Sequence, residues 1–282
     1  MTSARRPLLE VTDLAVRFAS PSGPLEAVRG VSFTLGRERL AIVGESGSGK
    51  SMTVRSLLGI AGPAATVTAS RARFGDIDLL SLSGAQLRAI RGRRIAMVVQ
   101  DPRQGLNPIR TIGNQVGEML RIHQDMPRRS IARRAVELLD EVHIRDPARV
   151  SRLHAHEISG GMAQRVMIAM MLAAGPEILI ADEATSALDA VVQHHILELI
   201  DEQVKRRGMG LILISHDLDL VAGYADRMLV MYGGRVVETL TAEQGYKNAQ
   251  HPYTRGLMAC TPSLAHPGGI LPTLERDPAW LL

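Results

Sequence analysis

The sequence has one cysteine and few aromatic residues, and these shortages exclude several classes of protein. A single thiol, Cys260, cannot form a disulfide framework or a cysteine-built metal cluster within one chain. Aromatic residues make up 3% of the 282 residues, too few for the stacking platforms that hold nucleic acid. The net charge of +4 therefore favours solvated basic faces or an anionic membrane surface over a nucleic-acid partner.

Long apolar runs are also missing. The longest, residues 166–174 and 178–181, are far shorter than the ~20 residues of a membrane helix. Arg5 and Arg6 are not followed by an apolar segment, so we expect no secretory signal and a cytoplasmic protein. A hydrophobic content of 45% supplies a sizeable core, in one large domain or two modest ones.

The most informative segment is residues 44–51, Gly-Glu-Ser-Gly-Ser-Gly-Lys-Ser, which matches the phosphate-loop pattern G-x-x-x-x-G-K-[ST]. An apolar stretch at 39–43 predicts a strand before it, and residues 52–58 predict a helix after it. Glycines let the backbone N–H groups turn inward around phosphates, at the positive end of that helix. Lys50 adds a full charge, and the only other lysines are Lys205 and Lys247. The alternative is a glycine-rich turn that arose by chance, but such a turn would not require a strand before it and a helix after it.

Periodicity predicts an α/β organisation with an inserted helical block. Residues 8–43 alternate apolar and polar positions around a turn at 20–24, which predicts antiparallel strands, and further strands are expected around 67–78 and 95–99. Between 101 and 165 the apolar spacing becomes helical. Beyond it, strands at 178–181, 211–214, 228–231 and 235–238 alternate with helices at 190–207 and 218–225, which predicts a parallel sheet.

Two carboxylates follow the apolar strand at 178–181. Asp182 is placed to hold Mg²⁺ opposite the hydroxyl of Ser51, because this ion prefers an oxygen shell. Glu183, one residue further, would act as general base toward a water molecule aimed at the γ-phosphate. The alternative is an exposed strand end with charged residues, but the phosphate loop makes the metal site the better interpretation.

Residues 158–165, Ile-Ser-Gly-Gly-Met-Ala-Gln-Arg, precede a long apolar segment and predict a second anion site at a helix N-terminus. An ordinary N-cap is the alternative. A second such site beside a phosphate loop suggests a nucleotide shared between two chains. The segment resembles the signature motif of ATP-binding cassette (ABC) ATPases, with Ile158 in place of the usual leucine.

The resemblance extends along nearly the whole chain and implies roles for further residues. Gln100 resembles the Q-loop glutamine, residues 186–189 the D-loop, and His216 the switch histidine that contacts the γ-phosphate. Ala184 departs from the family's usual proline. The resemblance implies a catalytic set of Glu183, His216 and Gln100, and a Mg²⁺ set of Ser51, Gln100 and Asp182. The implied ATP-binding set, in which Phe18 stacks on adenine, is Phe18, Gly44, Glu45, Ser46, Gly47, Ser48, Gly49, Lys50, Ser51, Met52, Ser159, Gly160 and Gly161.

Finer features resemble one branch, the ATPases of oligopeptide, dipeptide and nickel importers. They are Gln-Asp-Pro at 100–102, Leu-Asn-Pro at 106–108, the Ser-Gly-Gly-Met form of the signature, and His-Pro-Tyr-Thr at 251–254. Many peptide-type members extend into a cysteine-bearing tail, which is missing here. This absence keeps nickel, metallophore and opine importers open as alternatives.

The resemblance implies a phosphate-loop NTPase of the α/β class, with a parallel core sheet, an N-terminal antiparallel β subdomain and a helical insertion. We expect one ABC ATPase domain over 1–282, with a nucleotide-binding core at 8–100 and 166–240, a helical subdomain at 101–165 and a C-terminal extension at 241–282. The cofactors implied are ATP and Mg²⁺. The partners implied are two membrane permease subunits, a second ABC ATPase subunit or a second copy, and a substrate-binding protein.

The implied location is the cytoplasmic face of the inner membrane, as a peripheral subunit. The rival from another class is a soluble cassette protein acting on DNA or ribosomes. Such proteins typically carry coiled-coil insertions or tandem cassettes, and the sequence shows neither heptads nor a second phosphate loop. A phosphate-loop kinase is a weaker rival, because it would not need the Ser159-Gly160-Gly161 site.

Overall fold

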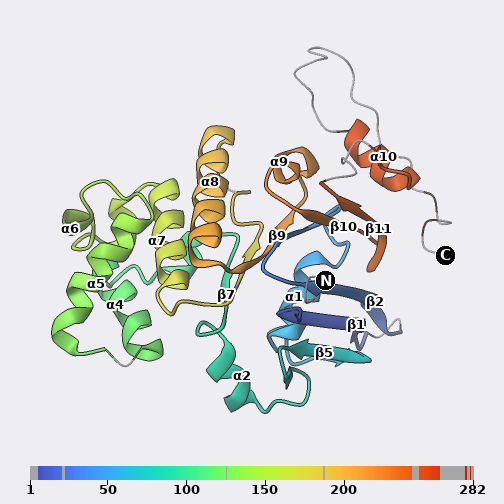
Figure 1. The fold of residues 1–282 in the computed structure, drawn as a ribbon, viewed down its shortest axis with the longest axis horizontal. Coiled ribbons are helices and arrows are strands. Elements are labelled where there is room, and N and C mark those ends of the chain that lie inside the picture. The colour runs from blue at the N-terminus through green and yellow to red at the C-terminus, as the bar shows by residue number, and fades with distance from the viewer. Residues whose placement is uncertain are drawn as a thin grey trace, which may run out of the picture. The chain divides into compact units, whose positions relative to one another are not determined.

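A computed structural model describes residues 6–20, 23–124, 126–186, 188–242, 248–260, 277 and 280. The chain divides into two compact units, Met1–Leu87 with Gly210–Leu282, and Arg88–Met209 (Figure 1). Each unit is built from segments of both helix and strand. Within the described ranges, no helix is both long and apolar enough to span a bilayer.

The first unit contains an antiparallel sheet close to the N-terminus. Its strand order is β2-β1-β5-β6, with β4 paired to β1. Alternate side chains of β1, including Leu14 and Val16, are fully buried, because successive residues of a strand point to opposite faces. The antiparallel arrangement expected for this region is confirmed. The strands are β1 (Leu9–Phe18), β2 (Leu25–Leu35), β4 (Ala65–Thr68), β5 (Arg71–Phe74) and β6 (Ile77–Asp78).

A second group of strands in this unit carries the phosphate loop. Strand β3 (Arg39–Val43) lies between β9 (Gly210–Ser215) and β10 (Arg227–Tyr232) and is parallel to both. All three are almost entirely buried, as expected of parallel strands covered on both faces. The described part of this unit includes the helices α1 (Lys50–Leu57), α9 (Leu218–Ala222) and α10 (Pro252–Ala259).

The last strand, β11 (Arg235–Thr241), corrects the expectation of uniformly parallel strands. It pairs antiparallel with β10. The connection is Gly233-Gly234, with φ angles of 52° and 85°. Two glycines with positive φ form the tight turn of a β-hairpin, whereas a parallel partner would need a crossover helix.

The second unit contains two parallel strands, β7 (Ile95–Val98) and β8 (Ile178–Asp182), and most of the helices. The helical periodicity expected between residues 101 and 165 is present. Helix α2 (Gly84–Ile90), whose residues are divided between the two units, was not predicted, because Ile90 is its one buried residue and leaves no periodic signal. The remaining helices are α3 (Pro102–Gly105), α4 (Ile112–His123), α5 (Arg128–Glu141), α6 (Pro147–Val150), the 3-10 helix η1 (Ala155–Glu157), α7 (Gly160–Leu172) and α8 (Ala190–Arg207).

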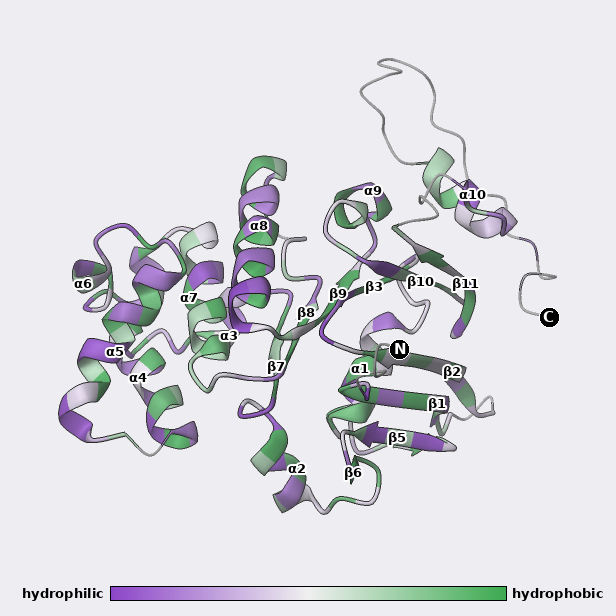
Figure 2. Cartoon of the chain, in the orientation of Figure 1, coloured by the Kyte–Doolittle hydropathy of each residue, from purple (hydrophilic) through white to green (hydrophobic). Residues whose placement is uncertain are grey.

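Helices α7 and α8 form much of the core of this unit. Eight of the thirteen residues of α7 are buried. Helix α8 is amphipathic, with buried Ile196, Leu199, Ile200 and Val204 on one side, and Figure 2 shows hydrophobic and hydrophilic residues alternating along it. Apolar burial of this kind is the main stabilising contribution to the unit.

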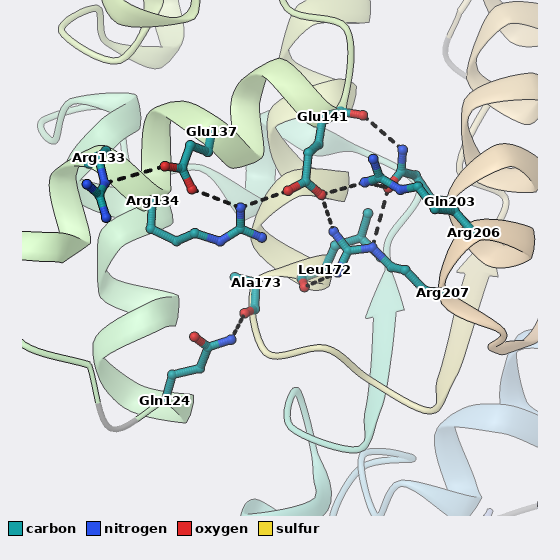
Figure 3. Close-up of polar contacts among 10 residues, drawn as sticks. All are labelled: Gln124, Arg133, Arg134, Glu137, Glu141, Leu172, Ala173, Gln203, Arg206 and Arg207. Atoms are coloured by element: carbon teal, nitrogen blue, oxygen red, sulfur yellow. Dashed lines mark hydrogen bonds and ion pairs between the residues drawn. The ribbon is translucent and has the colours of Figure 1, made fainter.

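The C-terminal ends of α5, α7 and α8 are joined by a polar network around Glu141 (Figure 3). The Glu141 carboxylate accepts hydrogen bonds from Arg134 at 2.8 Å and from Arg206 and Arg207 at 2.5 Å each. Arg207 also donates to the carbonyl oxygen of Leu172, the last residue of α7, at 3.2 Å. One carboxylate therefore connects α5 to α8, and Arg207 extends the connection to α7.

Candidate nucleotide site

The phosphate loop at residues 44–49 connects β3 to α1 and has a backbone that only glycine can adopt at two points. Gly44 has a φ of 146° and Gly49 a φ of 98°. A Cβ atom on Gly44 would lie 2.2 Å from the carbonyl oxygen of Met231, and one on Gly49 would lie 2.5 Å from that of Ala27. The loop therefore approaches neighbouring backbone too closely for any side chain at these positions.

Lys50, the first residue of α1, bonds back to the start of this loop. Its side chain is buried, with 4% of the residue exposed, and its Nζ atom donates to the carbonyl oxygens of Gly44 and Glu45 at 2.8 Å each. Helix α1 has no side-chain cap at Gly49, so the N–H groups of its first turn are not satisfied by a capping side chain. Among the described residues, the buried Ser48 hydroxyl has no hydrogen-bond partner. An uncapped helix start, a buried ammonium and an orphaned hydroxyl suit an anionic ligand.

His216 lies at the same edge of the parallel strands as the phosphate loop. Val43, the last residue of β3, is paired with Ser215, the last residue of β9, so Gly44 and His216 directly follow aligned strand ends. His216 is exposed, and the Asp217 side chain behind it caps α9 by accepting from the Leu220 N–H at 2.9 Å. Ligands of open α/β sheets bind at this carboxyl edge.

The second unit brings Gln100, Asp182 and Glu183 to one sheet edge. Val98 of β7 is paired with Ala181 of β8, and these three residues follow within two positions of the paired ends. Asp182 is 1% exposed, whereas Gln100 is exposed. Carboxylate oxygens at a strand end are ligands that a divalent cation such as Mg²⁺ prefers.

Glu183 has an unusual backbone. Its φ of 48° lies in the left-handed region, which costs a residue other than glycine about 1–3 kcal/mol. The turn is held by Ser186, whose N–H and hydroxyl both donate to the Glu183 carbonyl oxygen, at 3.1 Å each. Strained backbone of this kind is often retained at functional positions, because it points a side chain in a direction that a relaxed strand end would not allow.

The signature segment forms the start of α7. Ser159 is the N-cap, with its hydroxyl accepting from the Met162 N–H at 3.3 Å. A Cβ atom on Gly161 would lie 3.0 Å from Val192 Cγ1 of α8, so glycine allows α7 to approach α8 closely. Asp189 caps α8 in the same way as Ser159 caps α7. Ala187, in the predicted D-loop, lies outside the described residues.

Phe18 is the last residue of β1. It is partly exposed and lies opposite Leu25 of β2 and Ala65 of β4, and its contact with adenine stays a prediction.

Sequence reasoning missed Tyr253, whose hydroxyl accepts a hydrogen bond from the Glu45 N–H of the phosphate loop at 3.0 Å. The His-Pro-Tyr-Thr motif was the available signal, but it did not indicate a contact with the loop.

The phosphate loop, Asp182 and Glu183 at the end of β8, and the glycine-rich start of α7 define the protein's class. Residues 28–186 match the model of the ABC transporter family, and the chain belongs to this family.

Its relatives are more specific. The chain is 48% identical over 269 residues, 95% of its length, to a Brucella abortus (strain 2308) protein provisionally named a peptide import ATP-binding protein, 81% of which is covered. It is 44% identical to the dipeptide transport ATP-binding protein DppD of Bacillus subtilis (strain 168), over 96% of this chain and 82% of DppD. It also resembles the ATP-binding cassette MJ0796, solved as a dimer with ADP and phosphate, with a TM-score of 0.72, 25% identity, and coverage of 83% of this chain and 98% of that one. These similarities confirm the ABC ATPase fold expected from the sequence.

Proposed function

We propose that this protein is the ATP-hydrolysing subunit of an ABC importer for dipeptides or oligopeptides. The observation that carries ATP binding is the complete phosphate loop, with Lys50 bound to the Gly44 and Glu45 carbonyl oxygens and the Ser48 hydroxyl buried without a partner in the described chain. The peptide branch is supported by relatives named for peptide import that match almost the whole chain. Their names favour peptides over the nickel, metallophore and opine alternatives.

The donor set fits ATP with Mg²⁺. The Lys50 ammonium, together with the backbone N–H groups from Gly44 to Met52, would hold the β- and γ-phosphates. Ser51, Gln100 and Asp182 offer the hydroxyl, amide and carboxylate oxygens that Mg²⁺ prefers. When bound, the ion neutralises charge on the phosphate oxygens during transfer. Phe18 would stack on adenine.

Hydrolysis needs a base and a residue that responds to the γ-phosphate. Glu183 would accept a proton from the attacking water, a contribution typically worth about 10²–10⁴-fold. His216 and Gln100 would contact the γ-phosphate and the water, respectively. Ser159, Gly160 and Gly161, at the start of α7, would hold the nucleotide of a partner chain, so that two chains close around ATP.

Import requires membrane partners. We place the protein at the cytoplasmic face of the inner membrane, with two permease subunits, a second ATPase subunit or a second copy, and a substrate-binding protein in the same system. Binding of ATP would close the dimer and hydrolysis would release it, which transmits work to the permeases. The helical block at residues 101–165 would contact them.

The proposal is tested by affinity purification of the tagged full chain from native membranes, with ATP and Mg²⁺ present and copurifying chains identified by mass spectrometry. We expect two permeases, together with a second ATPase subunit if the dimer is heterologous. The Lys50→Ala variant, purified in the same way, is the control that shows whether copurification depends on nucleotide binding. Recovery of the chain with nucleic acid and without any permease would contradict the importer assignment and favour the soluble rival.

A further inference from the structure

The His-Pro-Tyr-Thr motif at residues 251–254 forms the start of α10 and contacts the phosphate loop. Tyr253 is fully buried, and its hydroxyl accepts the Glu45 N–H at 3.0 Å across 208 positions of sequence. Both residues belong to the first unit. Nothing in the proposed chemistry uses this tyrosine, so its burial against the loop needs an explanation of its own.

The Glu45 peptide is a fixed point of the loop. Its carbonyl oxygen accepts from Lys50 Nζ at 2.8 Å and from the Ser48 N–H at 3.2 Å, while its N–H donates to Tyr253. Next to it, Gly44 is pressed against the Met231 carbonyl oxygen. The Ser48 carbonyl oxygen in turn accepts from the Gly234 N–H at 3.1 Å. Tyr253 therefore supplies a side-chain anchor to a loop that also bonds to its own atoms and to the β10–β11 turn.

Tyr253 is itself held firmly. The His251 ring caps α10 by accepting from the Tyr253 N–H at 3.2 Å, and the Glu238 carboxylate of β11 accepts from the N–H groups of Gln250 and His251 at 2.6 and 3.3 Å. The tyrosine ring lies 4.5 Å from that of Tyr232 of β10 and 5.7 Å from that of Trp280, measured between centroids. A side chain with these contacts has little rotational freedom, so its hydroxyl is a rigid acceptor.

We propose that Tyr253 is a positioning residue of the nucleotide site. Its hydroxyl fixes the orientation of the Glu45 peptide, which keeps the Lys50 ammonium and the following loop amides directed at the phosphates. The C-terminal segment thereby sets the affinity for nucleotide, although it contributes no atom to the reaction. The inference rests on the proposed function, because it assumes that the loop binds nucleotide.

The test compares the full chain with two variants that each remove one hydroxyl and retain the ring. Tyr253→Phe removes the acceptor for Glu45, and Tyr232→Phe, the matched control, removes a hydroxyl from the adjacent ring and leaves the Tyr253–Glu45 bond intact. Binding of ADP in the presence of Mg²⁺ is measured by isothermal titration calorimetry, since ADP avoids turnover and nucleotide-driven dimerisation. Thermal unfolding without nucleotide checks that each variant folds, and we expect Tm changes of at most about 4 °C.

We expect the Kd for ADP to rise about three- to tenfold in Tyr253→Phe, the effect of losing one hydrogen bond, and to stay unchanged in Tyr232→Phe. A packing role alone would survive in Tyr253→Phe, because the ring remains. Wild-type binding together with a Tyr253→Phe Kd within twofold of wild type would overturn the inference and leave the proposed function intact. Failure of the wild type to bind ADP would overturn both.

Discussion

Gly44 illustrates how strongly single residues constrain this site. Its φ of 146° is a conformation that other L-residues rarely adopt, and its Cα lies where any Cβ would overlap the Met231 backbone. The motif in the sequence predicts that glycine is needed here, and the structure adds which backbone atom imposes the requirement. Phosphate loops position their amides by a close approach of the backbone. The room available at Gly44 therefore affects the affinity of the loop for nucleotide.

We predict that Gly44→Ala weakens ADP binding by about tenfold or more, because the loop has to move away from Met231 to relieve a contact of 2.2 Å. Calorimetric titration measures this change. Gly36→Ala is the matched control, since a Cβ atom there meets no heavy atom within 4 Å. Equal affinity of Gly44→Ala and wild type would show that the loop does not depend on this close approach.

Residues close in sequence were predictable, and residues far apart were not. The phosphate loop, Asp182 and Glu183 follow from patterns of a few consecutive positions. The Tyr253–Glu45 hydrogen bond joins residues 208 positions apart, and no local pattern reports such a contact. The left-handed backbone of Glu183 was also unpredictable, because neither glycine nor asparagine marks that position.

At the scale of elements, capping residues determined which boundaries could be predicted. Helix α8 was predicted at residues 190–207 and has these bounds, because Asp189 caps its start and Gly208 ends it with a φ of 61°. Strand β11 was expected in a parallel sheet, although the Gly233-Gly234 pair indicates a hairpin. Helix α2 gave no signal, because a short and mostly exposed helix has no apolar stripe.

The Glu141 network joins α5 to α8 electrostatically, and Figure 3 shows its three arginines converging on one carboxylate. Burial alone would raise the pKa of Glu141, but the hydrogen bond and charge of Arg134, with the charges of Arg207 and Arg206, bring the pKa below its ordinary value of 4.5. A carboxyl group with a lowered pKa stabilises the folded state above its ordinary pKa. That contribution is lost as the pH falls through the lowered value.

We predict that Glu141→Gln lowers the free energy of unfolding by about 1–2 kcal/mol at pH 7, because three arginines lose their shared partner while solvent still screens Arg206. The difference from wild type should shrink as the pH falls below 4.5. Urea unfolding at a series of pH values measures it. Glu137→Gln, at a carboxylate 47% exposed, is the control and should cost less. A difference that is constant across pH would contradict the charge-based account.

At the scale of the whole molecule, the proposed reaction draws on both compact units. The phosphate loop, His216 and Tyr253 belong to one, and Gln100, the start of α7, Asp182 and Glu183 belong to the other. Helix α10 and the phosphate loop that it contacts both belong to the first unit.

Hydrolysis of ATP by this chain is the central claim, and the most direct test is phosphate release from Mg²⁺-ATP by the membrane-purified complex with wild-type or Glu183→Gln protein. We predict that Glu183→Gln retains ATP binding and lowers the steady-state rate by about 10²-fold or more if the chain pairs with itself. If a second ATPase subunit supplies its own base, the rate should fall by roughly half, since one of two sites is removed. An unchanged rate would contradict the assignment of Glu183 as the base.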